Sequence, residues 1–332
     1  MLPFIGIFNK ITYDLESIIN FLKNTYTQRI IFFSLYQAFL SAFISCLLAI
    51  PFALALNRHK NLKIVKFIIS LCGFSFVIPS ILIVYAVIQL LGYNGFFNTY
   101  FDIYNFFSFE TIYGIKAILI AHVLLNTPFA SRLLFQNLNS IPKKYYEISR
   151  SIRLSYLGNI IELELPILKQ NLFTVFSIIF SLCFLSFAIV MALGGSPMYS
   201  TIEVAIYQYA LFELNFNKAI LLSFIQIVIC ILFVFIGFFK LKGSNFFEVD
   251  ISNNLHPHND IKTIKIFDFI LITIFSIFLF SPIIFIIINF LSSDFNNIFY
   301  DINFIKAFLN SLIISLISGS LVSIFGFSIS VL

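Results

Sequence analysis

His122 and Asn126 are two polar side chains, within a long apolar stretch, whose types and spacing could do chemistry. They are four residues apart, so on a helix they share one face. Polar groups of this kind inside a membrane usually face the interior of a helix bundle, where they hydrogen-bond to neighbouring helices or line a pathway. Packing is the commoner use, and contact with a transported molecule is the alternative. Glu203 and Gln208 are further polar candidates for the same pathway.

Sequence motifs for other chemistry are missing. The chain has no Gly-x-x-x-x-Gly-Lys-Ser/Thr phosphate loop for ATP hydrolysis and no His-Glu-x-x-His pair for a metalloprotease. His256 and His258 lie in a polar linker, and two histidines without further ligands are typical of linker composition. We therefore predict no catalytic site, no cofactor and no metal site. A multi-span membrane enzyme that uses His122, or a channel, is the alternative from another class.

The composition is that of a membrane protein. Hydrophobic residues make up 60% of the 332 residues, charged residues make up 11%, and the mean hydropathy is +1.00. A helix needs about 20 apolar residues to cross a bilayer. We find seven such runs: Ile30 to Leu56, Ile68 to Gly92, Ile115 to Leu134, Phe173 to Leu193, Ala219 to Phe239, Phe269 to Leu291, and Ala307 to Leu332. The sequence therefore predicts an all-α polytopic membrane protein with about seven transmembrane helices.

Basic residues are clustered between these runs. The three clusters are Arg58, Lys60, Lys63 and Lys66; Arg132, Lys143, Lys144, Arg150, Arg153 and Lys169; and Lys240, Lys242, Lys262 and Lys265. They alternate with neutral or acidic loops that contain Asp102, Glu110, Glu203 and Glu213. Because cytoplasmic loops are enriched in Lys and Arg, we predict that the three clusters face the cytoplasm and that the acidic loops face outside.

The segment of residues 140–170 is a charged island between two apolar runs. Pro142 suits a first helical turn, which predicts a helix from Lys143 to Ile152. On this helix we expect one packed face, made of Tyr145, Ile148 and Ile152, and one presented face, made of Glu147, Arg150 and Ser151. Ser155 can begin a second helix from Tyr156 to Leu163, and Pro166 marks the turn back into the membrane.

This island resembles the coupling loop of ABC-transporter permeases. The pattern of that loop is Glu-Ala-Ala, three residues, Gly, nine residues, Ile, one residue and Leu-Pro. The matching positions here are Glu147-Ile148-Ser149, then Arg153, then Leu163-Glu164-Leu165-Pro166, and Arg150 belongs to the same loop. Arg153 stands where the pattern has glycine, and a residue with a Cβ resists the positive φ of that turn. The resemblance implies a type I ABC importer permease fold, in which this loop docks on a separate ATPase.

Three longer stretches are similar to the thiamine permeases of bacterial ABC importers. They are FSLYQAFLSA at 33–42, AHVLLNTPFASRLLFQNLNSIP at 121–142 and SLCFLSFAIVMALGGSPMYSTIEVAIYQYA at 181–210. The ferric-iron permeases share the coupling loop and are the competing branch, but the run from Leu193 to Gln208 favours thiamine. The resemblance implies a multi-pass protein of the bacterial inner membrane that imports thiamine or its phosphates.

The same resemblance implies the partners and the mechanism. A cytoplasmic ABC ATPase dimer would drive alternating access, and a periplasmic thiamine-binding protein would deliver the substrate to the outer loops. Membrane lipid surrounds such a protein, and no nucleic acid takes part. The acidic residues Glu203 and Glu213 are candidate guiding charges for a cationic substrate.

A second, incomplete repeat is expected at the end of the chain. Ser34-Leu35, Ser41 and Ala42 recur as Ser311-Leu312, Ser318 and Gly319. We expect residues 1–262 to form a first permease repeat, with most of its first transmembrane helix missing at Met1 to Phe8, and residues 263–332 to begin a second one. On this interpretation the sequence is a fragment of a longer permease.

Overall fold

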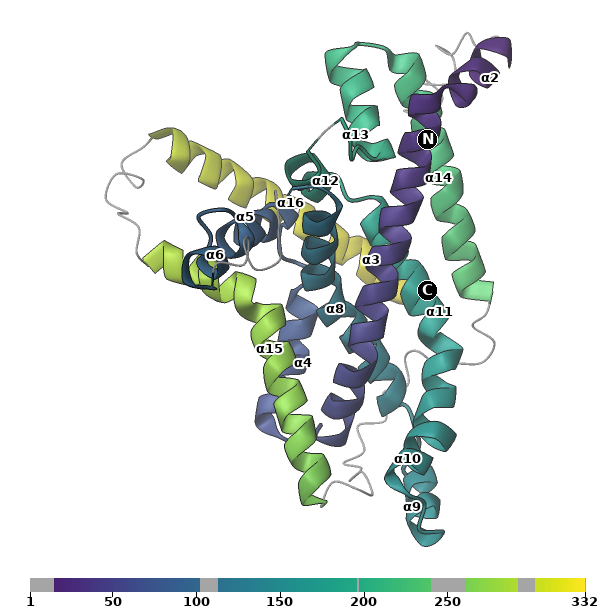
Figure 1. Cartoon of the computed structure of the whole chain (residues 1–332), viewed down its shortest axis with the longest axis vertical. Helices are drawn as coiled ribbons and strands as arrows, with labels where there is room; N and C mark the ends of the chain where they lie inside the picture. Colours follow the sequence, from purple (N-terminus) through teal and green to yellow (C-terminus); the bar gives the residue numbers. More distant parts are fainter. Residues whose placement is uncertain (1–14, 102–112, 196, 240–260, 292–301, 332) are drawn as a thin grey trace. The chain divides into compact units, whose positions relative to one another are not determined.

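The computed structural model describes residues 15–101, 113–195, 197–239, 261–291 and 302–331. Every regular element in these ranges is helical (Figure 1). The elements are α2 Leu15–Lys23, α3 Thr25–Arg58, α4 Lys63–Phe74, α5 Ser80–Leu91, α6 Phe96–Phe101, α8 Ile115–Asn139, α9 Lys143–Ser151, α10 Tyr156–Asn159, η1 Ile160–Glu164, α11 Leu165–Phe184, α12 Ala188–Leu193, α13 Ile202–Tyr207, η2 Gln208–Phe212, α14 Phe216–Phe239, α15 Lys262–Leu291 and α16 Ile302–Val331.

The chain divides into two units, which are residues up to Phe285 and residues from Ile286 onward. The first unit holds the helices from α2 to most of α15, and the second holds the end of α15 and α16. Several predicted features lie outside the described residues. They are Met1 to Phe8, Asp102, Glu110, Lys240, Lys242, His256 and His258.

Seven of the described helices are long and apolar enough to cross a membrane. They cover Thr25–Arg58, Ser80–Phe101, Ile115–Asn139, Tyr156–Phe184, Phe216–Gly237, Lys262–Ile288 and Ile302–Ile329. This confirms the predicted fold class, an all-α chain that passes through the membrane several times.

Helix α3 lies at the centre of the first unit, where it packs against α8 and α11. Its contact face carries small residues: Ala38, Ala42, Ala49 and Ala53 are fully buried. Small side chains let helix backbones approach closely, which is the main source of packing energy between helices in lipid. The sequence of α3 therefore sets the close packing of the helices around it.

The second predicted span, Ile68 to Gly92, is wrong as a single helix. Helix α4 ends at Phe74 and α5 begins at Ser80, directly after Pro79. Proline has no N–H to donate, and the backbone of Pro79 is extended with ψ of 130°. The hydroxyl of Ser75 donates to the carbonyl of Cys72 at 2.8 Å and helps to end α4. Hydropathy could not show this interruption, because the residues on both sides of it are apolar.

The fourth predicted span, Phe173 to Leu193, is also displaced. Helix α11 begins at Leu165 and ends at Phe184, and the short helix α12 follows after Leu185 to Phe187. Pro166 lies in the first turn of α11, where it does not interrupt the helix. The predicted turn at Pro166 is therefore absent, and α10 continues into α11 through the π-helical turn η1.

Candidate functional site

The charged island forms the predicted pair of short helices, α9 and α10. Helix α9 ends in a Schellman motif: the N–H of Arg153 donates to Arg150 at 3.1 Å, and the N–H of Leu154 donates to Ser149 at 2.9 Å. Arg153 has φ of +52°, so it adopts the left-handed conformation that its Cβ disfavours. The Ser155 hydroxyl accepts from the N–H of Gly158 at 3.0 Å and begins α10. The turn therefore has glycine-like geometry without glycine.

The predicted packing face of α9 is wrong. Tyr145, Ile148 and Ile152 are 54%, 50% and 65% exposed, whereas Tyr146 and Ser149 are buried. The reason is that the surface under α9 is polar, so the helix turns its hydrogen-bonding residues inward. Glu147, Arg150 and Ser151 are exposed, as expected. The outer surface of α9 therefore presents apolar and charged side chains together.

A buried polar network supports α9 from below. The Ser149 hydroxyl donates to the Asn159 side chain, which joins α9 to α10. The Tyr146 hydroxyl accepts from Asn57 Nδ2 at 3.3 Å and donates to Glu164 Oε1 at 3.5 Å. Burial raises the pKa of Tyr146, and the neighbouring Glu164 carboxylate raises it further. Tyr146 therefore keeps its proton and remains a donor to the carboxylate.

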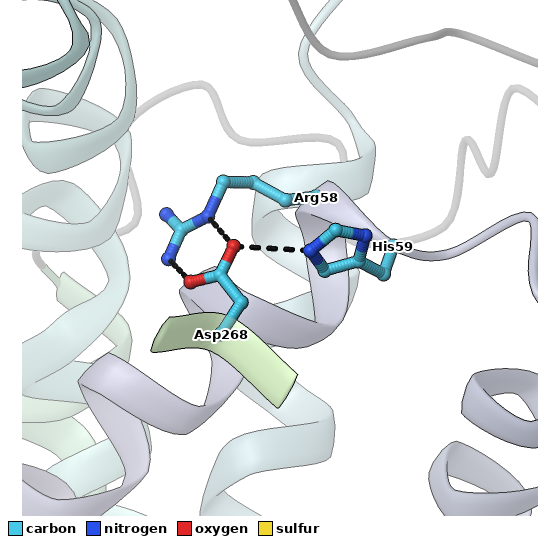
Figure 2. A network of polar contacts seen from close by, with 3 residues as sticks. All are labelled: Arg58, His59 and Asp268. Atoms are coloured by element: carbon cyan, nitrogen blue, oxygen red, sulfur yellow. Dashed lines mark hydrogen bonds and ion pairs between the residues drawn. The ribbon is translucent and has the colours of Figure 1, made fainter. Parts of the chain in front are cut away.

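A second network ties the end of α3 to α15 (Figure 2). Arg58 donates to both carboxylate oxygens of Asp268, at 2.8 and 2.6 Å, and His59 Nε2 lies 3.1 Å from Oδ2 of the same carboxylate. All three side chains are buried. The Arg58 guanidinium also lies 5.3 Å from the ring centre of Tyr156, the first residue of α10. The two networks therefore fasten α9 and α10 to both α3 and α15.

Sequence reasoning missed the second network. The sequence indicates Arg58 only as a member of a basic, cytoplasmic cluster, and no motif includes Asp268. One signal could have found it: Asp268 is the single acidic residue between Lys262 and Leu291. An ionisable residue in a membrane-spanning helix usually has a partner.

The remaining positions that resemble the coupling loop lie where α10 becomes α11. Leu163 and Leu165 are half-buried on either side of Glu164, and Pro166 is exposed. The Glu164 side chain is fully buried. These residues therefore form the joint between the short helices and the membrane-spanning helix.

The structure brings together two of the four candidate pathway residues. His122 and Asn126 are buried on α8 and line one cavity. His122 Nδ1 lies 3.0 Å from the Ser41 hydroxyl, and Asn126 Nδ2 donates to Cys183 Sγ at 3.2 Å. Glu203 and Gln208 belong to α13 and η2 and do not line this cavity. Among the described residues, no group of three or more metal-ligating side chains could hold a metal ion.

Comparison with known proteins gives three kinds of result. No model of a protein family matches the chain. It is 35% identical over 270 residues to the thiamine transport system permease protein ThiP of Haemophilus influenzae, a match that covers 81% of this chain and 49% of that protein. It is 25% identical over 248 residues to the putative ferric transport system permease protein FbpB 1 of the same organism, covering 71% of this chain and 39% of the relative.

The fold is similar to that of a chain in the crystal structure of a bacterial ABC transporter involved in the import of the acidic polysaccharide alginate. The TM-score is 0.57 at 16% identity, and the match covers 71% of this chain and 87% of that chain. The chain spans about half the length of the thiamine permease that it matches. Its fold is similar to that of an ABC-transporter permease chain, and its sequence is similar over most of its length to the thiamine transport system permease proteins.

Proposed function

We propose that this chain is a membrane-spanning part of an ATP-driven importer of thiamine or its phosphates in the bacterial inner membrane. The observation that carries the proposal is the 35% identity to a thiamine permease over 81% of the chain. A ferric-iron permease is the alternative, supported by a match at 25% identity. The chain itself would hydrolyse no ATP, so the energy comes from a separate ATPase dimer.

The outer surface of α9 is the proposed docking site for that ATPase. Glu147, Ile148 and Arg150 are exposed on a helix that is fixed from beneath, so the surface is held in one geometry. Exposed apolar residues beside charged ones are typical of the contact surfaces of protein partners. Ser149 faces inward, so its role would be to position α9. The joint at Leu163, Leu165 and Pro166 would carry the movement of α9 into α11.

The proposed mechanism is alternating access. Closure of the ATPase dimer would move α9 and α10 as a rigid body, and the bundle would change between inward- and outward-open states. A periplasmic thiamine-binding protein would dock at the opposite end, where Glu203 and Glu213 could attract a cation. We retain the proposed division into a first repeat, residues 1–262 with the coupling loop at 140–170, and the beginning of a second repeat at 263–332.

Transport by the assembled system tests this function. Vesicles that contain the complete permease, the ATPase and the binding protein should take up radiolabelled thiamine when ATP is supplied, and ferric iron should not compete. Vesicles that receive a non-hydrolysable ATP analogue are the control. Iron uptake without thiamine uptake would assign the chain to the ferric branch. Uptake of thiamine without ATP would favour a channel.

A further inference from the structure

The two interrupted helices of the first unit meet at one cavity. Its volume is about 420 Å³. Ser75 and Ser80 line it from the break between α4 and α5, and Ser186 and Phe187 line it from the break between α11 and α12. Non-helical backbone at membrane depth is stable only where protein covers it or where it lines a polar cavity. In membrane transporters, discontinuous helices are a common way to build a substrate site.

Helix α8 supplies two further polar side chains to the cavity, His122 and Asn126. His122 is 1% exposed, and its Nε2 atom has no hydrogen-bond partner among the described residues. In a neutral imidazole one ring nitrogen donates and the other accepts, so Nε2 takes whichever role Nδ1 does not take with Ser41. A buried polar atom without a partner is costly to leave in that state. Nε2 is therefore a buried position whose missing hydrogen bond a ligand in the cavity could supply after a small side-chain movement.

Apart from the three serines, the remaining lining side chains are apolar, and some of them are aromatic. Phe76 and Phe129 stack with ring centres 5.0 Å apart, and both rings line the cavity together with Phe187. Aromatic faces attract flat rings and organic cations. The lining side chains include no carboxylate, no lysine and no arginine. The cavity therefore lacks the carboxylates that usually hold a hard metal cation, and its polar edges beside aromatic faces suit a flat heteroaromatic molecule.

We infer that this cavity is a binding site within the membrane for the ring system of the transported molecule. The inference rests on the proposed function, in which that molecule is thiamine. Thiamine has an aminopyrimidine ring with donors and acceptors on its edge and a positively charged thiazolium ring. His122 Nε2 and the Asn126 side chain bind the edge of the aminopyrimidine, and the aromatic wall of Phe76 and Phe129 receives the thiazolium ring. The cavity thus selects the substrate a second time, after the binding protein.

Uptake of thiamine and of oxythiamine, in which a carbonyl replaces the amino group, tests the hydrogen-bonding part. The assay uses vesicles with the complete permease, the ATPase and the binding protein. His122→Leu should lower thiamine uptake about tenfold, the effect of one buried hydrogen bond, and should reduce the preference for thiamine over oxythiamine. His122→Gln should restore part of both. Phe43→Leu, on the exposed surface of α3, is the matched control and should change neither.

Protection of an introduced cysteine tests occupancy without removing any ligand group. Ser80→Cys and Ser186→Cys should react with a soluble thiol reagent more slowly when thiamine is present. The wild-type chain gives the background from its own cysteines. Asn61→Cys, exposed between α3 and α4, should react at the same rate with and without thiamine.

The outcomes separate the two proposals. Wild-type uptake of thiamine, with unchanged kinetics and unchanged analogue preference in the His122 variants, overturns the cavity site and leaves the importer intact. Should the His122 variants fail to fold, unprotected cysteines at positions 80 and 186 overturn it instead. No thiamine uptake by the wild-type system overturns the proposed function and the cavity site together.

Discussion

Arg58 and Asp268 form a buried ion pair with two hydrogen bonds, at 2.8 and 2.6 Å, across 210 residues of chain. The pair joins the last residue of α3 to the second turn of α15, so it connects the proposed first repeat to the beginning of the second. His59 contacts Asp268 and Tyr156 contacts Arg58, so the pair also lies beside the start of α10.

Removing one partner of this pair should be strongly destabilising. We expect Asp268→Ala to lower the free energy of unfolding by about 3–5 kcal/mol, because it leaves the buried Arg58 charge without compensation. Replacing both residues, as Arg58→Met with Asp268→Leu, should recover most of this loss. Reversible unfolding in detergent measures the free energy of unfolding of the single and the double variant. Lys265→Ala, exposed on the same helix, is the control, and an equal effect of Lys265→Ala and Asp268→Ala would contradict the prediction.

At Arg153, unlike at Asp268, we expect a substitution to stabilise the protein. A non-glycine residue in the left-handed region costs about 1–2 kcal/mol. Glycine removes this strain, but it also gives the unfolded chain more conformational freedom. The net effect of Arg153→Gly should be a rise in the free energy of unfolding of about 0.5 kcal/mol. Arg153→Val should lower it, because β-branched residues tolerate positive φ least. Arg150→Gly, three residues earlier inside α9, should instead destabilise by about 1 kcal/mol. A higher free energy of unfolding for Arg153→Val than for Arg153→Gly would contradict this prediction.

Tyr146 and Tyr145 are neighbours with opposite surroundings, which makes them a matched pair. Tyr146→Phe removes a buried hydroxyl that contacts Asn57 and Glu164, and we expect a loss of about 1–3 kcal/mol. Tyr145→Phe alters an exposed side chain and should change stability by less than about 0.5 kcal/mol. Hydrogen exchange of the amides in residues 143–164 measures the local effect. Equal exchange rates in the two variants would show that the network does not support α9.

The proposed docking surface predicts a loss of partner binding without a loss of fold. Glu147→Lys and Ile148→Ala should each weaken retention of the ATPase on membranes, and a charge reversal at a docked contact costs about 2–5 kcal/mol. Glu147→Ala should have a smaller effect, since it removes a charge without adding a repulsive one. Lys66→Ala, exposed on α4, serves as the control. Unchanged ATPase retention in both Glu147 variants would remove the docking role.

Hydropathy predicted the number of spans and the class of the fold because lipid imposes a length of apolar sequence on every crossing helix. It could not locate the interruptions at Pro79 and Leu185, since apolar residues flank both. Periodicity placed Tyr145, Ile148 and Ile152 on one face correctly but could not say which face is covered. That depends on Asn57, Asn159 and Glu164, which come from other parts of the chain. The contact between Arg58 and Asp268 follows no local rule of sequence.

The π-helical turn at Ile160–Glu164 has a mechanical consequence. It joins α10 to α11 without a loop, so Tyr156–Phe184 is one continuous rod of 29 residues, about 40 Å long. A continuous helical segment can transmit a displacement from one end to the other. One end lies beside α9, and the other ends at Leu185, in the wall of the cavity that contains His122. Under the proposed function, a tilt imposed on this segment beside α9 would therefore shift Leu185 in the wall of that cavity.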